Sequence, residues 1–209
     1  MTNHTLRTHH LVALALTAPL IISIGIDSAY RISTGNPTFI TDDTVGPPVL
    51  GALVNGLLGV AFMALFWVLR SESSRFSVLG RVPSVCRRVL EVGTVLLGVG
   101  MLVTGPVFKA AGIDSGALYD GSGLVAAAGL GLTVLAALVL GLSQIRDNRI
   151  GWGGRLLALI VPAGVVTALL AVVDADLASP VLLTACLLGG LALLGAGTVA
   201  PAVEAAPAR

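Results

Sequence analysis

The chain has few charged residues. Asp, Glu, Lys and Arg make up 11% of its 209 residues, whereas 56% are hydrophobic and the mean hydropathy is +0.97. A water-soluble domain carries about 25% charged residues, because these side chains cover its wet surface. The shortage excludes a soluble globular domain, and the net charge of +1 gives no general attraction to nucleic acid.

Cysteine pairs and catalytic motifs are also missing. The two cysteines, Cys86 and Cys186, fall in a predicted loop and in the last predicted helix. A disulfide needs Cα atoms within about 7 Å, so we expect both thiols to be free. Neither has a second cysteine or histidine at zinc-binding spacing, and the GxxxxGK[ST], HExxH and nucleophile-elbow motifs are absent. We therefore predict no catalytic residue, no metal site and no cofactor.

What the chain does have is long apolar runs. A helix of about 20 apolar residues crosses the hydrocarbon core of a bilayer. The first run also resembles the core of a signal peptide, but we predict an uncleaved helix. The sequence thus predicts an all-α, polytopic membrane bundle, a single domain over residues 1–209. Its six predicted helices cover about 11–30, 47–69, 89–108, 122–145, 156–174 and 180–202.

Basic residues gather on one side of this predicted topology. With the N-terminus inside, ten of the twelve Lys and Arg residues fall on the inner side, and only Arg31 and Lys109 fall outside. Short loops rich in Lys and Arg stay in the cytoplasm. We therefore predict a multi-pass protein of the cell membrane with both termini cytoplasmic. Trp67 and Trp152 then lie at inner helix ends, as expected for interfacial aromatic residues.

A short pattern occurs twice. Pro19 precedes Gly-Ile-Asp-Ser at 25–28, and Pro106 precedes the same four residues at 112–115 at identical spacing. Pro162, followed by Asp174, is a looser echo in the fifth predicted helix. The pattern suggests three repeated helical hairpins with a proline in each outgoing helix. Chance repetition in a chain rich in Ala, Leu, Val and Gly is the alternative.

Small residues recur at helical spacing. In the fourth predicted helix, Gly123, Ala127 and Gly131 lie four residues apart and share one stripe. Such stripes let membrane helices approach closely, because lipid removes the hydrophobic drive for helix association. We expect the stripe to pack within the bundle. The alternative is a face for a homo-oligomer or another membrane subunit.

Polar residues inside the predicted helices are the candidates for function, because a charge in the bilayer costs about 2.5–3.5 kcal/mol on insertion scales. Glu91 follows Arg87 and Arg88 by one helical turn, which predicts an ion pair at the inner interface. Asn55 lies mid-helix, and we expect its amide to form an interhelical hydrogen bond. Proton handling or substrate binding is the alternative for Glu91, and contact with a ligand is the alternative for Asn55.

Acidic residues fall at the outer helix ends. Asp27 precedes Arg31 by one turn, which favours a local pair. If the three hairpins pack side by side, Asp27, Asp114 and Asp174 converge. Four further acids are able to join them: Asp176, Asp42, Asp43 and Asp120. Clustered carboxylates bind hard cations through oxygen or share protons. The predicted ligand or ion residues are Asp27, Asp114, Asp174 and Asp176, together with Glu91 and Asn55.

The three histidines, His4, His9 and His10, precede the first apolar run. A histidine pair can bind a metal or sense pH. Three histidines in a terminal head are more simply solvated, and we expect that here.

Three classes of function fit these features. The first is a transporter-like or accessory subunit that handles a hydrophobic small molecule or an ion within the bilayer. The second is a structural partner of a larger membrane complex. The third, which we rank last, is an intramembrane enzyme that uses carboxylates on a lipidic substrate. The expected partners are the lipid bilayer, a lipid-like small molecule, and a second copy or another membrane subunit, but no nucleic acid.

Overall fold

The computed structural model describes residues 6–38, 40, 47–113, 115–145, 149–174 and 177–197, and all regular structure in these ranges is helical. The fold class is therefore the predicted all-α bundle. The α-helices are α1 (Thr8–Thr34), α2 (Pro48–Ser71), α3 (Ser73–Val78), α4 (Arg81–Leu102), α5 (Ala117–Ser143), α6 (Trp152–Ala158), α7 (Ile160–Val173), α8 (Val181–Thr184) and α9 (Gly190–Ala192), and the π-helical segments are η1 (Val103–Phe108) and η3 (Ala185–Gly189).

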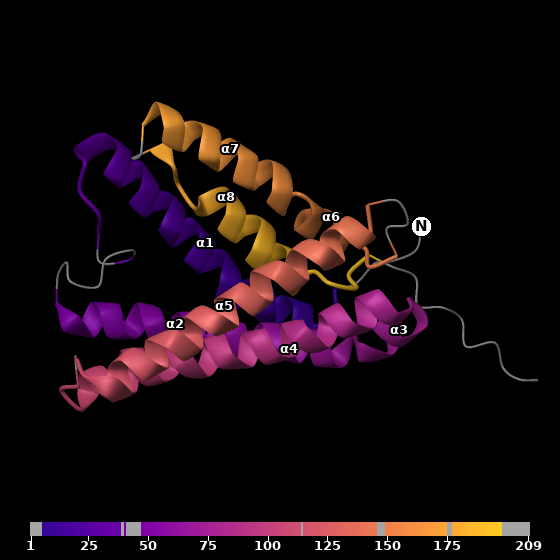
Figure 1. Ribbon diagram of the computed structural model, residues 1–209, viewed down its shortest axis with the longest axis horizontal. Coiled ribbons are helices and arrows are strands. Elements are labelled where there is room, and N and C mark those ends of the chain that lie inside the picture. Colours follow the sequence, from indigo (N-terminus) through magenta and orange to yellow (C-terminus); the bar gives the residue numbers. More distant parts are fainter. Residues whose placement is uncertain are drawn as a thin grey trace, which may run out of the picture.

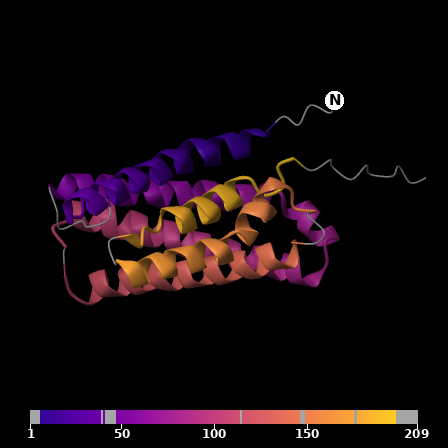
Figure 2. The ribbon, with the colours of Figure 1, turned by 90° about the horizontal axis from the view of Figure 1, so that it is seen from above.

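The chain runs back and forth between two ends of the molecule. Arg7, Arg70, Arg75 and Arg81 lie at one end, which we call the arginine-rich end, and Arg31 and Lys109 lie toward the opposite end. Two layers of three segments result, with α2, α4 and α5 in one layer and α1, α7 and the α8–α9 segment in the other (Figures 1 and 2). The layers meet at the arginine-rich end and diverge toward the opposite end (Figure 1).

Five of the described helical stretches are long and apolar enough to cross a membrane. They correspond to the first five predicted spans. The sixth, Val181–Ala192, is shorter than predicted. At about 1.5 Å per residue it extends only about 18 Å, against about 30 Å of hydrocarbon. The helix ends because Gly195 and Gly197 adopt φ of 83° and 77°, which turn the chain back toward Ile150 and Trp152.

The prolines interrupt two of the outgoing helices. Proline lacks an N–H and its ring crowds the carbonyl four residues earlier. Pro162 follows a break at Leu159 that separates α6 from α7, and Pro106 lies inside the π-helical segment η1. Pro19 lies within the unbroken helix α1. The two copies of the repeat also differ, since Gly25 is helical and Gly112 is in a turn with φ of 68°.

Helix α4 begins eight residues before the predicted start at 89. The predicted boundary was wrong because Arg81, Arg87 and Arg88 lower the hydropathy of a segment that is nevertheless helical. Cys86, predicted in a loop, is therefore a buried helical residue. Both Cys86 and Cys186 are free, as predicted.

The seam between α4 and α5 depends on glycines other than the predicted stripe. A Cβ at Gly129 would lie 2.7 Å from the Leu97 nitrogen and 2.9 Å from the Gly93 carbonyl oxygen. Gly123, Ala127 and Gly131 are exposed, and a Cβ at either of these glycines would meet nothing within 4 Å. The expectation that this stripe packs inside the bundle was wrong for the single chain. The face of α5 that packs on α4 contains Gly129, which lies two residues before Gly131 and on a different side of the helix.

The buried apolar core lies where the two layers meet. Leu65 and Leu69 of α2 pack there with Leu140 of α5, Leu157 of α6 and Leu191 of α9. Toward the opposite end the two layers diverge (Figure 1), and Val172 near the end of α7 is 85% exposed. The buried core is thus concentrated toward the arginine-rich end.

Candidate functional site

An apolar crevice lies between the two layers. Its volume is about 380 Å³, within the range of about 300–1,000 Å³ of ligand pockets. Thr184 is the polar residue of a lining that comes from both layers: Ile24, Leu58, Phe62, Leu97, Met101, Leu130, Val134, Ile160, Leu183, Thr184, Leu187 and Leu188. A cavity with this lining can hold an apolar chain and offers little to a polar solute.

Asp27, a predicted outer-site residue, is buried near the end of α1. Its Oδ1 accepts hydrogen bonds from the backbone nitrogen of Thr38, at 2.8 Å, and from the Thr38 hydroxyl. The next residue, Ser28, accepts a hydrogen bond of 2.6 Å from the Ser179 hydroxyl. The Ser28–Ser179 contact joins the end of α1 to the segment before α8, and the contacts of Asp27 join it to the segment that follows α1.

Of the other three outer acids predicted as ligand or ion residues, Asp174 alone lies among the described residues. Asp174 is exposed at the end of α7. Asp114 and Asp176 lie outside the described residues. The outer acidic site therefore remains a prediction.

Asn55 is half-buried on α2 and faces a second cavity of about 390 Å³, which Thr104, Tyr119 and Gly123 also line. Its Cβ lies close to Gly105, where an added Cβ would be only 2.4 Å away. The amide forms no hydrogen bond with the part of the chain that is described, so the predicted interhelical bond is not seen.

Glu91 forms the predicted ion pair with Arg87, one turn earlier on α4. Both side chains are largely buried, whereas Arg88 is exposed. Neither Glu91 nor Asp27 lines the apolar crevice. An enzymatic role for either carboxylate remains an untested prediction.

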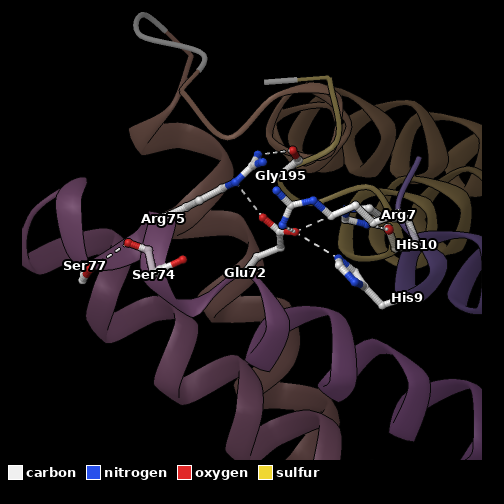
Figure 3. A network of polar contacts seen from close by, with 9 residues as sticks. Arg7, His9, His10, Glu72, Ser74, Arg75, Ser77 and Gly195 are labelled. Carbon is white, nitrogen blue, oxygen red and sulfur yellow. Dashed lines mark hydrogen bonds and ion pairs between the residues drawn. The ribbon is translucent and has the colours of Figure 1, made fainter. Parts of the chain in front are cut away.

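A polar cluster that the sequence did not reveal lies at the arginine-rich end. Figure 3 shows Glu72, between α2 and α3, surrounded by His9 and His10 of α1, with Arg7 just before them and Arg75 of α3. Oε1 of Glu72 lies 3.0 Å from His9 Nε2, 3.6 Å from His10 Nε2 and 3.2 Å from Arg7 Nη1. Oε2 lies 2.8 Å from Arg75 Nε. We call these five residues the Glu72 cluster.

The cluster joins three distant parts of the chain. His10 Nδ1 lies 2.9 Å from the carbonyl oxygen of Ala192, and Arg75 donates a hydrogen bond to the carbonyl oxygen of Gly195. The start of α1, the end of α2 and the segment after α9 are thereby held together. The cluster therefore holds the two layers together at the arginine-rich end.

Glu72 is ionised in this setting. It is 1% exposed, and this burial works to raise its pKa. The neighbouring His10, the charge of Arg75, the hydrogen bond with His9 and the charge of Arg7 lower the pKa by more, to about 2. A carboxylate thus persists in a buried site because it is surrounded by donors and cations.

The expectation of solvated histidines was wrong for His9 and His10, which are 8% and 2% exposed; His4 lies outside the described residues. Glu72 was missed because it sits among arginines in what looked like a loop. One signal was present in the sequence: the first predicted helix starts, and the second ends, at the same face of the membrane. Neighbouring helices of opposite direction place His9, His10 and Glu72 at one level.

No protein-family model matches the chain, and neither a curated protein nor a solved structure is significantly similar to it.

Proposed function

We propose that this protein binds a hydrophobic, lipid-like molecule in the crevice between its two layers, as a transporter-like or accessory subunit of the membrane. The apolar lining of a cavity of about 380 Å³, contributed by both layers, carries the proposal. Five helices are long and apolar enough to cross a membrane, which supports a cavity within reach of lipid tails.

The arrangement of the layers supports entry from the bilayer. The packed core and the Glu72 cluster hold the layers together at the arginine-rich end. At the opposite end the layers diverge (Figure 1), and apolar side chains such as Val172 are exposed. Lateral entry of an apolar chain is favoured because no charged residue among those described lines the crevice.

Filling the crevice tests the proposal. Thr184→Trp adds a large apolar ring to the lining from one layer, and Val134→Phe adds bulk from the other. We expect both variants to retain less lipid-like material than the unmodified protein. The measurement is native mass spectrometry of protein purified in mild detergent, combined with identification of the extracted small molecules.

Val172→Trp is the matched control, because Val172 is exposed on α7 and is not part of the lining. It should retain the same material as the unmodified protein. Equal retention in all four proteins would reject the crevice as the binding site. If Thr184→Trp does not fold, Val134→Phe still decides the outcome.

A second candidate is an assembly role in a larger membrane complex. It is favoured by the exposed stripe of Gly123, Ala127 and Gly131 on α5, which leaves room for the backbone of another helix. Chemical cross-linking in native membranes, comparing the unmodified protein with Gly131→Leu, tests it. Loss of a specific cross-linked partner in the variant would support assembly, and an unchanged pattern would count against it.

A further inference from the structure

Three metal-ligand side chains converge inside the Glu72 cluster. One ring nitrogen of His9, one of His10 and a Glu72 carboxylate oxygen lie within 4.8 Å of one another, and all three residues are buried. They come from one turn of α1 and from the end of α2. Convergence of this kind requires tertiary packing, since His9 and Glu72 are 63 residues apart.

The hydrogen bond of His10 fixes which of its nitrogens can bind a cation. A carbonyl oxygen can only accept, so the contact with Ala192 places the ring proton on Nδ1. In the neutral ring, Nε2 then carries a lone pair, and it faces Glu72 Oε1 at 3.6 Å. The two acceptors are reconciled either by a proton on Nε2, which makes His10 a donor to Glu72, or by a metal ion in the place of that proton. Ligating histidines usually donate their other N–H to a carbonyl or carboxylate in this way.

The spacing also fits an ion. Two ligand atoms about 2.0–2.1 Å from a tetrahedral Zn²⁺ are about 3.3 Å apart. The distances from Oε1 to His9 Nε2 and to His10 Nε2 are 3.0 and 3.6 Å, on either side of that value. Side-chain adjustment that brings the two histidine nitrogens to the same separation would place all three ligands on one ion, with a fourth position open to water.

The two arginines of the cluster determine which Glu72 oxygen is available to an ion. Arg75 contacts Oε2, which leaves Oε1 for the metal. Arg7 contacts Oε1 at 3.2 Å, but its side chain is 51% exposed and can move into solvent. An ion bound at Oε1 would take the place that the Arg7 guanidinium now holds.

We propose that His9, His10 and Glu72 form a binding site for a divalent transition metal of the Zn²⁺ class, in which the metal and Arg7 compete for the same carboxylate oxygen. Two imidazoles and one carboxylate are a donor set that Zn²⁺ uses with an open fourth position. The bound metal would add a bond between the start of α1 and the end of α2.

The test uses Co²⁺ and Zn²⁺ on tag-free, chelator-treated protein in detergent. A His4→Gln, Trp152→Phe background leaves His9 and His10 as the histidines and Trp67 as the tryptophan. The Trp67 ring lies 6.1 Å from that of His9, so Co²⁺ at the site should quench its fluorescence and Zn²⁺ should reverse the quenching. We expect one ion per chain and a higher melting temperature with Zn²⁺.

His9→Gln and His10→Gln should each weaken binding by more than about tenfold, because each removes one of three ligands. Arg7→Gln should tighten binding severalfold, since it removes the competing cation. Asp120→Asn is the matched control, an exposed carboxylate of α5 outside the cluster, and should bind as the background does. Glu72→Gln should abolish binding, but the histidine variants decide the test if it does not fold.

Several results would overturn the site. Absence of saturable binding at one ion per chain would do so, as would affinity unchanged by both histidine substitutions. Weaker binding in the Arg7→Gln variant would reject the competition between Arg7 and the metal.

Discussion

At the scale of single residues, the cost of burying a charge explains which polar groups have partners. Glu91 and Glu72 both lie at low exposure, and each is joined to at least one arginine. Removing one partner of a buried ion pair leaves the other charge uncompensated, which costs about 3–5 kcal/mol. The partners of each carboxylate should therefore matter more to stability than surface arginines do.

Arg87→Gln tests this principle at α4. We expect it to lower the free energy of unfolding by about 3 kcal/mol, because Glu91 loses its buried partner. Arg88→Gln is the adjacent control, and since Arg88 is exposed its effect should stay within about 0.5 kcal/mol. Denaturation in detergent micelles measures both. Equal effects of the two substitutions would contradict the pairing, and the double variant Arg87→Gln, Glu91→Gln should recover part of the loss.

At the scale of helices, close backbone approach distinguishes the α4–α5 seam from the lipid-facing side of α5. We predict that Gly129→Ala destabilises the protein by about 2 kcal/mol, because the new methyl group would overlap backbone atoms of α4 that cannot move aside. Gly131→Ala adds the same group on the exposed face and should be neutral or stabilising by up to about 1 kcal/mol. Thermal unfolding in detergent compares them, and similar losses would contradict the seam.

Hydropathy predicted where the helices lie along the chain, but it did not predict which face of each helix packs against its neighbours. Long apolar runs placed α1, α2 and α5 to within a few residues at most ends. The stripe of Gly123, Ala127 and Gly131 suggested the wrong packing face, because glycines at Gly121, Gly123, Gly129 and Gly131 allow more than one stripe on α5. Gly129 is identified as the packing position only by the backbone of α4, which lies too close to leave room for a Cβ. The break between α6 and α7, just before Pro162, was not predicted, and Pro19 lies in a regular helix.

At the scale of the whole molecule, the candidate sites arise from contacts between distant segments. The crevice takes its lining from both layers, and the Glu72 cluster takes its residues from α1, α3 and the turn after α2. Hydropathy predicts which segments are helical but carries no information on which side chains face each other. The pair of Arg87 and Glu91 was predictable because both lie on one helix, whereas the pair of His9 and Glu72 was not.

The distribution of arginines also predicts how the whole molecule sits in the membrane. Ser77 of α3 and Asn36, just after α1, are exposed near opposite ends of the bundle. With Cys86 and Cys186 replaced by Ala, we expect Asn36→Cys to react with a membrane-impermeant maleimide in intact cells. Ser77→Cys should react only after permeabilisation, because it lies at the end with most of the arginines, which the positive-inside rule keeps in the cytoplasm. The reverse pattern would show that the arginine-rich end, with the Glu72 cluster, faces outward, and any metal bound there would then come from the exterior.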